Sequence, residues 1–449
     1  MIFMIRDLIC RFVSHLAGGS QTLLAAAVLA GSSFLVSAQA TDAGPRASLA
    51  ATPPMGWNSW NTFGNQINED VVRGVADKIV ALGLRDLGYQ YIVIDDHWEG
   101  GRDTAGHLLA STNKFPHGVK ALADYVHEKG LKFGIYSCAG DSTCGGEAGS
   151  YGHEEDDAAT FASWGVDYLK YDYCNAPEDM EAAIHRYTKM AEALKATGRP
   201  IVFSICEWGG RAPWLWARKA GGQLWRISYD VGDMWDAPED THSCIGILTA
   251  IDASVNLASF AGPSGWNDPD MLVVGLGNTG NIKGGGCTSS EYQMQMSMWC
   301  MLAAPLMIGC DIRNMDTDTR RILTNSEAIA VDQDTLGNQG TRVARFSSTD
   351  IWKKPLANGD LAVALLNRGE SEAMIKVNWK QLEINPDTSL KVRDLWKHED
   401  LGTFSGDLSI AVSPHAAALL RTSAQKASAA TSVVSATSLT SQNTPSLQK

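Results

Sequence analysis

The chain has 449 residues, of which 45% are hydrophobic and 19% charged, so it is long enough for one large domain and a small one. Its formal net charge is −13, and it contains no long Lys/Arg cluster. This balance argues against nucleic acid and anionic membrane surfaces as partners and favours a neutral or cationic partner.

Residues 1–40 have the pattern of an export signal. Basic residues precede a short apolar run from Leu23 to Val36, and Ala38-Gln39-Ala40 then has the small-x-small form of a cleavage site. The run is shorter than the roughly 20 residues that a membrane-spanning helix needs, and no other segment qualifies. We therefore expect a soluble, exported protein, periplasmic or secreted, with a linker over residues 41–51.

From residue 52 to residue 337 a strand pattern alternates with a helix pattern. The expected strand segments cover residues 55–60, 91–98, 132–140, 166–174, 201–208, 224–230, 265–271 and 305–311. Helical patterns lie between them, for example over residues 68–83, 178–197 and 212–220. This rhythm and length predict a (β/α)8 TIM barrel. A doubly wound open sheet is the alternative, but no GxGxxG motif follows the first strand.

The pattern changes after Gly340. Short alternating runs follow, with hairpin signals at Asn358-Gly359 and at Asn367-Arg368-Gly369. Residues 338–421 are therefore predicted to form a small antiparallel β-sandwich, and no charged or aromatic cluster marks a second active site there. Residues 422–449 are rich in Ser, Thr, Ala and Gln without apolar periodicity, which predicts a disordered tail.

Acidic residues stand at the carboxyl ends of the expected barrel strands, where barrel enzymes carry their chemistry. Asp95 and Asp96 end the second strand, Asp172 the fourth and Asp230 the sixth, and Asp270 follows the seventh. Alternate strands of a barrel supply the same layers of its interior. The second, fourth and sixth strands can therefore aim Asp95, Asp172 and Asp230 at one another.

Two carboxyl groups that face each other across a pocket are what glycoside hydrolysis requires. Lys170 shares a face of the strand with Asp172, so we expect it to lower the pKa of this nucleophile candidate. Aromatic residues near Asp230 in the sequence, among them Tyr229 and Trp235, suggest an apolar wall that raises its pKa and suits a general acid. A structural ion pair for Asp172 and a helix cap for Asp230 are the alternatives.

The Asp95-Asp96 pair suits sugar binding, because both carboxylates can accept hydrogen bonds from adjacent hydroxyl groups at a bending strand end. Metal binding by Asp95, Asp96 and His97 is the competing interpretation. It is disfavoured because neither a second His nor a regular ligand spacing supports it. Arg226 and Trp208 can supply a hydrogen-bond donor and a stacking face.

A series of short motifs follows along the chain: PPMGWNSW, YIVIDDHW, the run from Arg102 to Gly118, GIY, LKYDYC, CEWG, WR...D and WNDPDM. In this order they resemble the glycoside hydrolase family 27 α-galactosidases over about residues 52–421. The resemblance implies a retaining α-galactosidase that uses no cofactor and no metal. Asp172 matches the family's nucleophile and Asp230 its acid/base. The family's galactose-contacting positions fall on Trp60, Asp95, Asp96, Tyr136, Lys170, Trp208, Arg226 and Asp270.

Nine cysteines are present, one of them in the expected export signal. Cys144 and Cys174 match a disulfide that joins two active-site loops in the family. Many members carry a second cystine, whose two positions read Asn65 and His97 here, so this tether is absent and the rigidity of that pocket wall is open. Cys206 has no family partner and is expected to be a free, buried thiol. The pairing is left open for Cys244, Cys287, Cys300 and Cys310.

The predicted function is the release of terminal α-D-galactosyl residues from galacto-oligosaccharides or galactomannan by double displacement. Related glycosidases acting on β-L-arabinopyranosides or α-N-acetylgalactosaminides are the alternative within the same class. A non-catalytic carbohydrate-binding barrel is the alternative from another class. The presence of both Asp172 and Asp230 argues against it, because a binding protein has no need for the pair.

Overall fold

The structure is a computed structural model that describes residues 49–237 and 244–424. The expected export signal of residues 1–40 lies outside these ranges, as do residues 41–48 of the expected linker and residues 425–449 of the expected tail. None of the helices within the described ranges is long and apolar enough to cross a membrane.

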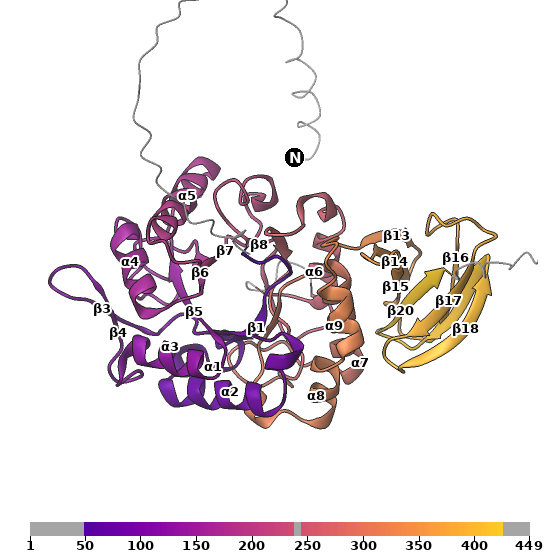
Figure 1. Cartoon of the computed structure of the whole chain (residues 1–449), viewed down its shortest axis with the longest axis horizontal. Coiled ribbons are helices and arrows are strands. Elements are labelled where there is room, and N and C mark those ends of the chain that lie inside the picture. Colours follow the sequence, from indigo (N-terminus) through magenta and orange to yellow (C-terminus); the bar gives the residue numbers. More distant parts are fainter. Residues whose placement is uncertain (1–48, 238–243, 425–449) are drawn as a thin grey trace, which may run out of the picture. The chain divides into compact units, whose positions relative to one another are not determined.

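Eight parallel strands surround the centre of the larger domain (Figure 1). In spatial order they are β11 (Trp266–Asp268), β8 (Leu224–Arg226), β7 (Val202–Ile205), β6 (Tyr168–Asp172), β5 (Lys132–Cys138), β2 (Tyr91–Val93), β1 (Met55–Asn58) and β12 (Leu306–Ile308). The two ends meet just beyond β11, where the Leu272 amide donates to Met307 O at 2.8 Å. The predicted (β/α)8 barrel is confirmed, and the open doubly wound sheet is wrong.

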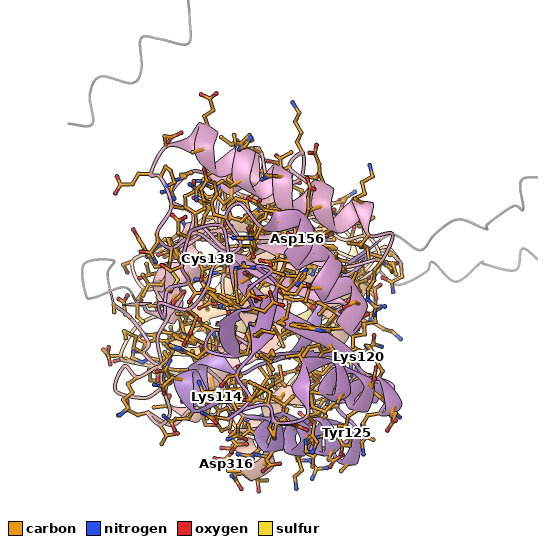
Figure 2. The ribbon with its side chains drawn as sticks, turned by 90° about the vertical axis from the view of Figure 1, so that its left-hand side faces the viewer. Lys114, Lys120, Tyr125, Cys138, Asp156 and Asp316 are labelled. Carbon is orange, nitrogen blue, oxygen red and sulfur yellow. A yellow bond between two sulfur atoms is a disulfide. The ribbon has the colours of Figure 1, made fainter. Side chains whose placement is uncertain are left out.

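Most of the helices in this domain cover the outside of the barrel. The helices are α1 (Trp60–Phe63), α2 (Glu69–Ala81), α3 (Gly118–Glu128), α4 (Glu154–Trp164), α5 (Met180–Ala196), α6 (Ile247–Ala253), α7 (Ser289–Leu302), α8 (Thr317–Leu323) and α9 (Ser326–Asp332). Of these, α2 and α3 each bury an apolar face, whereas α7 is buried on nearly all sides. Figure 2 shows Lys120 of α3 and Asp156 of α4 on the outer surface, where both side chains are exposed.

Local sequence signals set the ends of several helices. Asp179 caps α5 by accepting a hydrogen bond from the Ala182 amide, and Thr288 and Glu291 form a complete capping box at the start of α7. The helix expected over residues 212–220 is wrong. Only the short turn Pro213–Leu215 forms there, because Trp216, with a φ of −134°, leaves the helical conformation directly after it.

Two short pairings modify the loops at the carboxyl ends of the strands. A hairpin joins β3 (Glu99–Arg102) to β4 (Leu108–Ala110), and β9 (Asp230–Val231) pairs in parallel with β10 (Cys244–Ile245). Asp230 was expected to end the sixth barrel strand, but that strand, β8, already ends at Arg226. The position of Asp230 is therefore set by the separate β9–β10 pairing.

The second domain is the predicted antiparallel sandwich. One sheet has the order β13 (Thr341–Arg345), β14 (Thr349–Pro355), β15 (Leu361–Asn367), β20 (Ala416–Ala424), β17 (Ser389–Asp394) and β18 (Glu399–Ser405). The other pairs β16 (Ala373–Asn378) with β19 (Asp407–Val412). Residues 422–424 complete β20 instead of beginning a tail, because Thr422 pairs with Leu361 and Val392 on both sides.

Candidate active site

A cavity of about 330 Å³ lies at the carboxyl ends of the barrel strands. Its volume is in the range of small-molecule binding sites. The wall consists of Trp60, Asp95, Asp96, Tyr136, Cys144, Lys170, Asp172, Cys174, Trp208, Tyr229 and Asp230. The sequence singled out all of these as site or disulfide residues except Tyr229, which it named only as part of the aromatic setting of Asp230. Arg226 and Asp270 do not line this cavity but a much smaller one of about 20 Å³, and Lys170 lines both.

Asp172 is the last residue of β6 and is only 5% exposed. Its Oδ2 accepts a hydrogen bond from the Tyr136 hydroxyl at 3.1 Å, and its Oδ1 accepts one from the Tyr173 amide at 3.0 Å. Burial raises the pKa of Asp172 to about 6, although the Lys170 ammonium acts to lower it. The predicted lowering of this pKa is wrong, because removal from water has the larger effect.

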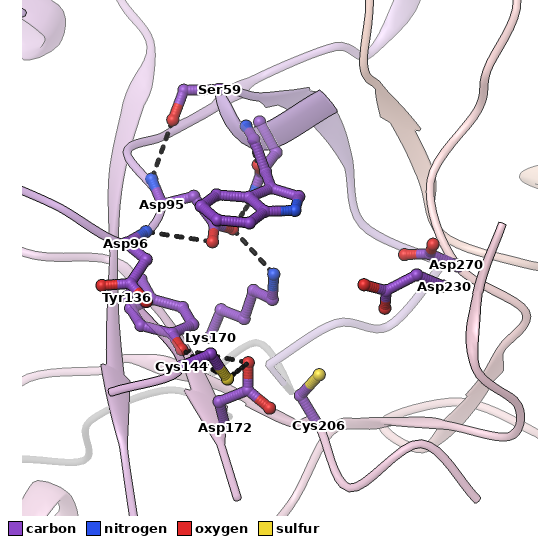
Figure 3. Close-up of polar contacts among 12 residues, drawn as sticks. Ser59, Asp95, Asp96, Tyr136, Cys144, Lys170, Asp172, Cys206, Asp230 and Asp270 are labelled. Carbon is purple, nitrogen blue, oxygen red and sulfur yellow. Dashed lines mark hydrogen bonds and ion pairs between the residues drawn. The ribbon is translucent and has the colours of Figure 1, made fainter. Parts of the chain in front are cut away.

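Lys170 makes its ion pair with Asp95 and not with Asp172. Its Nζ lies 2.8 Å from Asp95 Oδ2 (Figure 3). The same oxygen accepts a hydrogen bond from the side-chain Nδ2 of Asn58 at 2.7 Å. Burial alone would lower the pKa of Lys170, but the surrounding carboxylates raise it well above its ordinary value. Asp95 is thus held in one orientation next to a permanent cation. Sequence reasoning missed Asn58, whose signal is a polar residue at the end of the buried strand β1.

The loop that follows β5 packs closely over Asp96 and Asp172. Cys144 forms the expected disulfide with Cys174, with 5.1 Å between their Cα atoms, and its sulfur lies 3.4 Å from Asp172 Oδ2. The Gly145 amide donates to Asp96 Oδ2 at 2.7 Å. A Cβ atom at Gly145 would lie 2.3 Å from the His97 ring, so a side chain there would have to displace this ring.

His97 connects two walls of the cavity without a covalent bond. Its ring stacks on Trp60 with 6.2 Å between ring centroids and 17° between planes, and its Nδ1 lies 3.2 Å from Glu147 Oε1. This contact tethers the region where many members of the family have the second cystine. The His97 ring contacts Trp60 and Glu147. It therefore does not share with the Asp95 and Asp96 carboxylates a position where a metal ion could bind. This geometry disfavours the alternative metal site.

Arg226 links Asp230 to Asp270. Figure 3 shows these two carboxyl groups on the opposite side of the site from Asp95 and Asp96. The Nη2 of Arg226 lies 2.9 Å from Asp230 Oδ1 and its Nη1 lies 3.0 Å from Asp270 Oδ1. The Asp230 side chain is 35% exposed. Its direct partner is therefore this guanidinium and not the predicted apolar wall. Burial, together with the neighbouring Asp230 carboxylate, raises the pKa of Asp270 to about 7 against the lowering effect of Arg226.

Cys206 lies between these groups, in the wall of the smaller cavity. It is 1% exposed and forms no disulfide among the described residues, which confirms the predicted free, buried thiol. Burial raises its pKa well above the ordinary value, so the thiol stays protonated. The sequence left the pairing of four other cysteines open. Within the described ranges they are also free thiols: Cys244, Cys287, Cys300 and Cys310.

Comparison with known proteins identifies the family. A model of the family Alpha galactosidase A matches residues 52–334, and a model of the Alpha galactosidase C-terminal beta sandwich domain matches residues 346–422. A protein named alpha-galactosidase from Cyamopsis tetragonoloba is 47% identical over 372 residues, which cover 82% of this chain and 85% of that protein.

Solved structures give the same result. Alpha-galactosidase I from Mortierella vinacea superimposes with a TM-score of 0.79 and 38% identity over 83% of this chain and 97% of that chain. A β-L-arabinopyranosidase from Geobacillus stearothermophilus is more distant, with a TM-score of 0.74 and 27% identity over 83% of this chain and 97% of that chain. The chain is a glycoside hydrolase and belongs to the alpha-galactosidase family.

Proposed function

We propose that the protein hydrolyses terminal α-D-galactosides with retention of configuration, with Asp172 as nucleophile and Asp230 as acid/base. One observation carries this assignment: Asp172 and Asp230 line the same cavity from different strands and have different partners. Asp172 is buried and held by Tyr136 and Tyr173, whereas Asp230 is partly exposed next to Arg226. Two carboxyl groups in contrasting environments suit the two roles of a retaining glycosidase.

In the first step Asp172 attacks the anomeric carbon from the β face while Asp230 donates a proton to the departing oxygen. The bond to the leaving group breaks as a β-galactosyl ester forms on Asp172. In the second step Asp230 takes a proton from water, which attacks the ester from the α face and releases α-galactose. The Tyr136 hydroxyl orients the Asp172 carboxylate, because its 3.1 Å hydrogen bond fixes Oδ2.

The inner wall of the cavity is suited to bind the sugar that is cleaved. Asp95 and Asp96 accept hydrogen bonds from hydroxyl groups, Lys170 donates one, and the Trp60 and Trp208 rings offer apolar faces. Arg226 and Asp270 act from behind the cavity wall, by orienting Asp230, and not as direct sugar contacts. This differs from the role that the family resemblance implies for these two positions.

A panel of p-nitrophenyl glycosides tests the substrate assignment. We expect the α-D-galactoside to have a kcat/KM at least about 100-fold higher than the β-L-arabinopyranoside and the α-N-acetylgalactosaminide, because differences at one buried contact are worth 10- to 200-fold or more. NMR of the fresh reaction should show α-galactose as the first product. A preference for either other glycoside would replace galactose as the substrate, and first release of the β-anomer would exclude double displacement.

The pH dependence of kcat/KM follows from Asp172. Only the ionised carboxylate attacks, and burial raises its pKa to about 6. We therefore expect kcat/KM to fall as the pH drops through 6 and to lose about tenfold for each further pH unit. A pH series with p-nitrophenyl α-galactoside measures this limb. A constant kcat/KM down to pH 4 would contradict the role of Asp172 as the group that must lose its proton.

We also propose that the enzyme acts outside the cytoplasm, in the periplasm or secreted. The support is the export-signal pattern of residues 1–40, followed by a linker to residue 51. In the same proposal the catalytic domain covers residues 52–337 and the sandwich domain residues 338–421. Oligosaccharides and galactomannan side chains are the substrates that suit this location.

A further inference from the structure

Tyr229 lines the cavity, and the sequence suggested it only as one of the aromatic residues near Asp230, without a contact to the substrate. It lies between the end of β8 and the start of β9, directly before Asp230. Its side chain is 42% exposed and lines the cavity. Large aromatic side chains with this exposure are uncommon in the described part of the chain, and Tyr229 has an accessible face directly beside the proposed acid/base.

A second aromatic residue borders the same side of the cavity. Trp208 follows β7, and the next residue, Gly209, has a φ of 77°. A Cβ atom on Gly209 would lie 2.2 Å from the carbonyl oxygen of Ile227, so this turn packs directly against the backbone that leads to Tyr229. Trp208 packs against the main core, which fixes its position. Trp208 and Tyr229 therefore stand on adjoining loops at one edge of the cavity.

The opposite side of the cavity is chemically different. It is lined by the charged side chains of Asp95, Asp96 and Lys170. Lys170 pairs with Asp95, and Asp96 accepts a hydrogen bond from the loop after β5. Asp172 is 5% exposed, whereas the Asp230 side chain is 35% exposed. Tyr229 and Asp230 therefore lie at an open part of the cavity rim, and the exposed Cys144 lies at another.

The chemistry of cleavage fixes where the leaving group lies. Its oxygen must be within hydrogen-bond reach of the acid while Asp172 is close to the anomeric carbon. The charged inner wall holds the sugar that is cleaved, so the next unit of the substrate extends past Asp230 toward solvent. Tyr229 is adjacent to Asp230 in the chain and exposed to this space, so it is placed to contact that unit.

We propose that the ring of Tyr229 forms the binding surface for the first sugar ring of the leaving group. This inference rests on the proposed function and names its substrate class as galactosyl oligosaccharides. A phenol ring has an apolar face for the C–H groups of a pyranose or furanose and keeps its hydroxyl in water. The same surface would bind an acceptor sugar when the galactosyl ester on Asp172 is transferred to a sugar in place of water.

Two substrates with the same galactosyl group test the proposal. Raffinose has a sugar leaving group, whereas α-galactosyl fluoride has only a fluoride ion. For Tyr229→Ala we expect the ratio of kcat/KM for raffinose to kcat/KM for the fluoride to fall about tenfold, because stacked contacts of this kind are worth about one such factor. Tyr229→Phe keeps the ring and should keep most of the ratio.

Tyr151→Ala is the matched control. Tyr151 is 44% exposed, lies over the Arg186 guanidinium and is outside the cavity wall, so its removal should leave the ratio unchanged. The proposal is overturned if Tyr229→Ala leaves the ratio within twofold of the original protein, or if Tyr229→Phe loses as much as Tyr229→Ala. Failure of the original protein to cleave either galactoside would instead refute the proposed function itself.

Transfer to an acceptor gives an independent measurement. With α-galactosyl fluoride as donor and sucrose as added acceptor, the original protein should form a galactosyl-sucrose product in addition to galactose. Tyr229→Ala should lower the share of transfer product severalfold, and Tyr151→Ala should not. An equal share of transfer product in Tyr229→Ala and the original protein would contradict the binding of a sugar ring at this surface.

Discussion

Replacing Asp172 by Asn will lower kcat by a factor of about 10,000 or more, because the amide cannot form the galactosyl ester. Its shape is nearly that of Asp, so the Tyr136 hydroxyl can still donate to the side-chain oxygen at this position. Turnover of p-nitrophenyl α-galactoside measures the loss. Asp156→Asn, the same chemical change on the exposed surface of α4, is the control and should keep full activity. A kcat within tenfold of the original protein would exclude Asp172 as nucleophile.

The configuration of the product formed with azide is a second measurement of the role of Asp172. In Asp172→Gly the cavity has room for azide, which can attack the anomeric carbon of an activated α-galactoside from the β face and produce β-galactosyl azide. The bond to the leaving group breaks as the carbon–nitrogen bond forms, so the configuration inverts once. Formation of α-galactosyl azide by this variant would mean that another residue had formed the ester.

The Asp172→Asn variant should also be more stable than the original protein at neutral pH. Asp172 has a folded-state pKa of about 6 against an ordinary value of 3.8, so its ionisation destabilises the folded state as the pH rises through this window. Two pKa units correspond to about 3 kcal/mol. We expect Asn to increase the free energy of unfolding by about 1–3 kcal/mol at pH 7 and to have little effect at pH 4. Thermal unfolding at both pH values measures this difference.

Replacing Asp230 by Ala will lower kcat/KM for raffinose by a factor of about 1,000 or more, because a sugar alkoxide is a poor leaving group without a proton donor. A substrate with a good leaving group, such as a dinitrophenyl α-galactoside, needs little protonation. It should still form the ester on Asp172, which then accumulates because no base activates water. A burst of dinitrophenol followed by slow turnover is the expected time course.

Azide distinguishes the two carboxyl groups. In Asp230→Ala it should attack the accumulated ester from the α face, restore turnover severalfold and produce α-galactosyl azide, after two inversions. Asp270→Asn is an informative comparison, because Asp270 binds Arg226 behind the cavity wall. It should weaken activity by disturbing Asp230 but should not give azide rescue. If Asp270→Asn showed the rescue and Asp230→Ala did not, the acid/base assignment would move to Asp270.

Much of the site was predictable because strand ends are visible in the sequence. Apolar runs stop at Asp95 and Asp172, and the carboxyl ends of parallel strands meet at one edge of a barrel. The positions of these carboxyl groups around one cavity therefore follow from the order of the strands. The disulfide between Cys144 and Cys174 followed from the family resemblance, since the loops after neighbouring strands β5 and β6 lie side by side.

The partners of the charged groups could not be predicted in this way. Lys170 is two residues from Asp172, yet its long side chain reaches across the barrel to Asp95, where Asn58 provides a second hydrogen bond. Arg226 similarly reaches both Asp230 and Asp270. Distance along the chain says little about such contacts, because the end of a flexible side chain can meet any group inside the barrel.

The barrel, the sandwich and the acidic residues at the strand ends could be predicted from the amino-acid sequence, because they depend on the burial pattern of short segments and on the order of these segments along the chain. Which acid is buried and which is exposed depends on the packed fold and could not be predicted in this way. Burial of Asp172, the pairing of Asp230 through β9 and β10, and the open face of Tyr229 all depend on how separate loops pack at the rim of the barrel. Access to water sets the pKa of a carboxyl group, and that access is a property of the assembled fold.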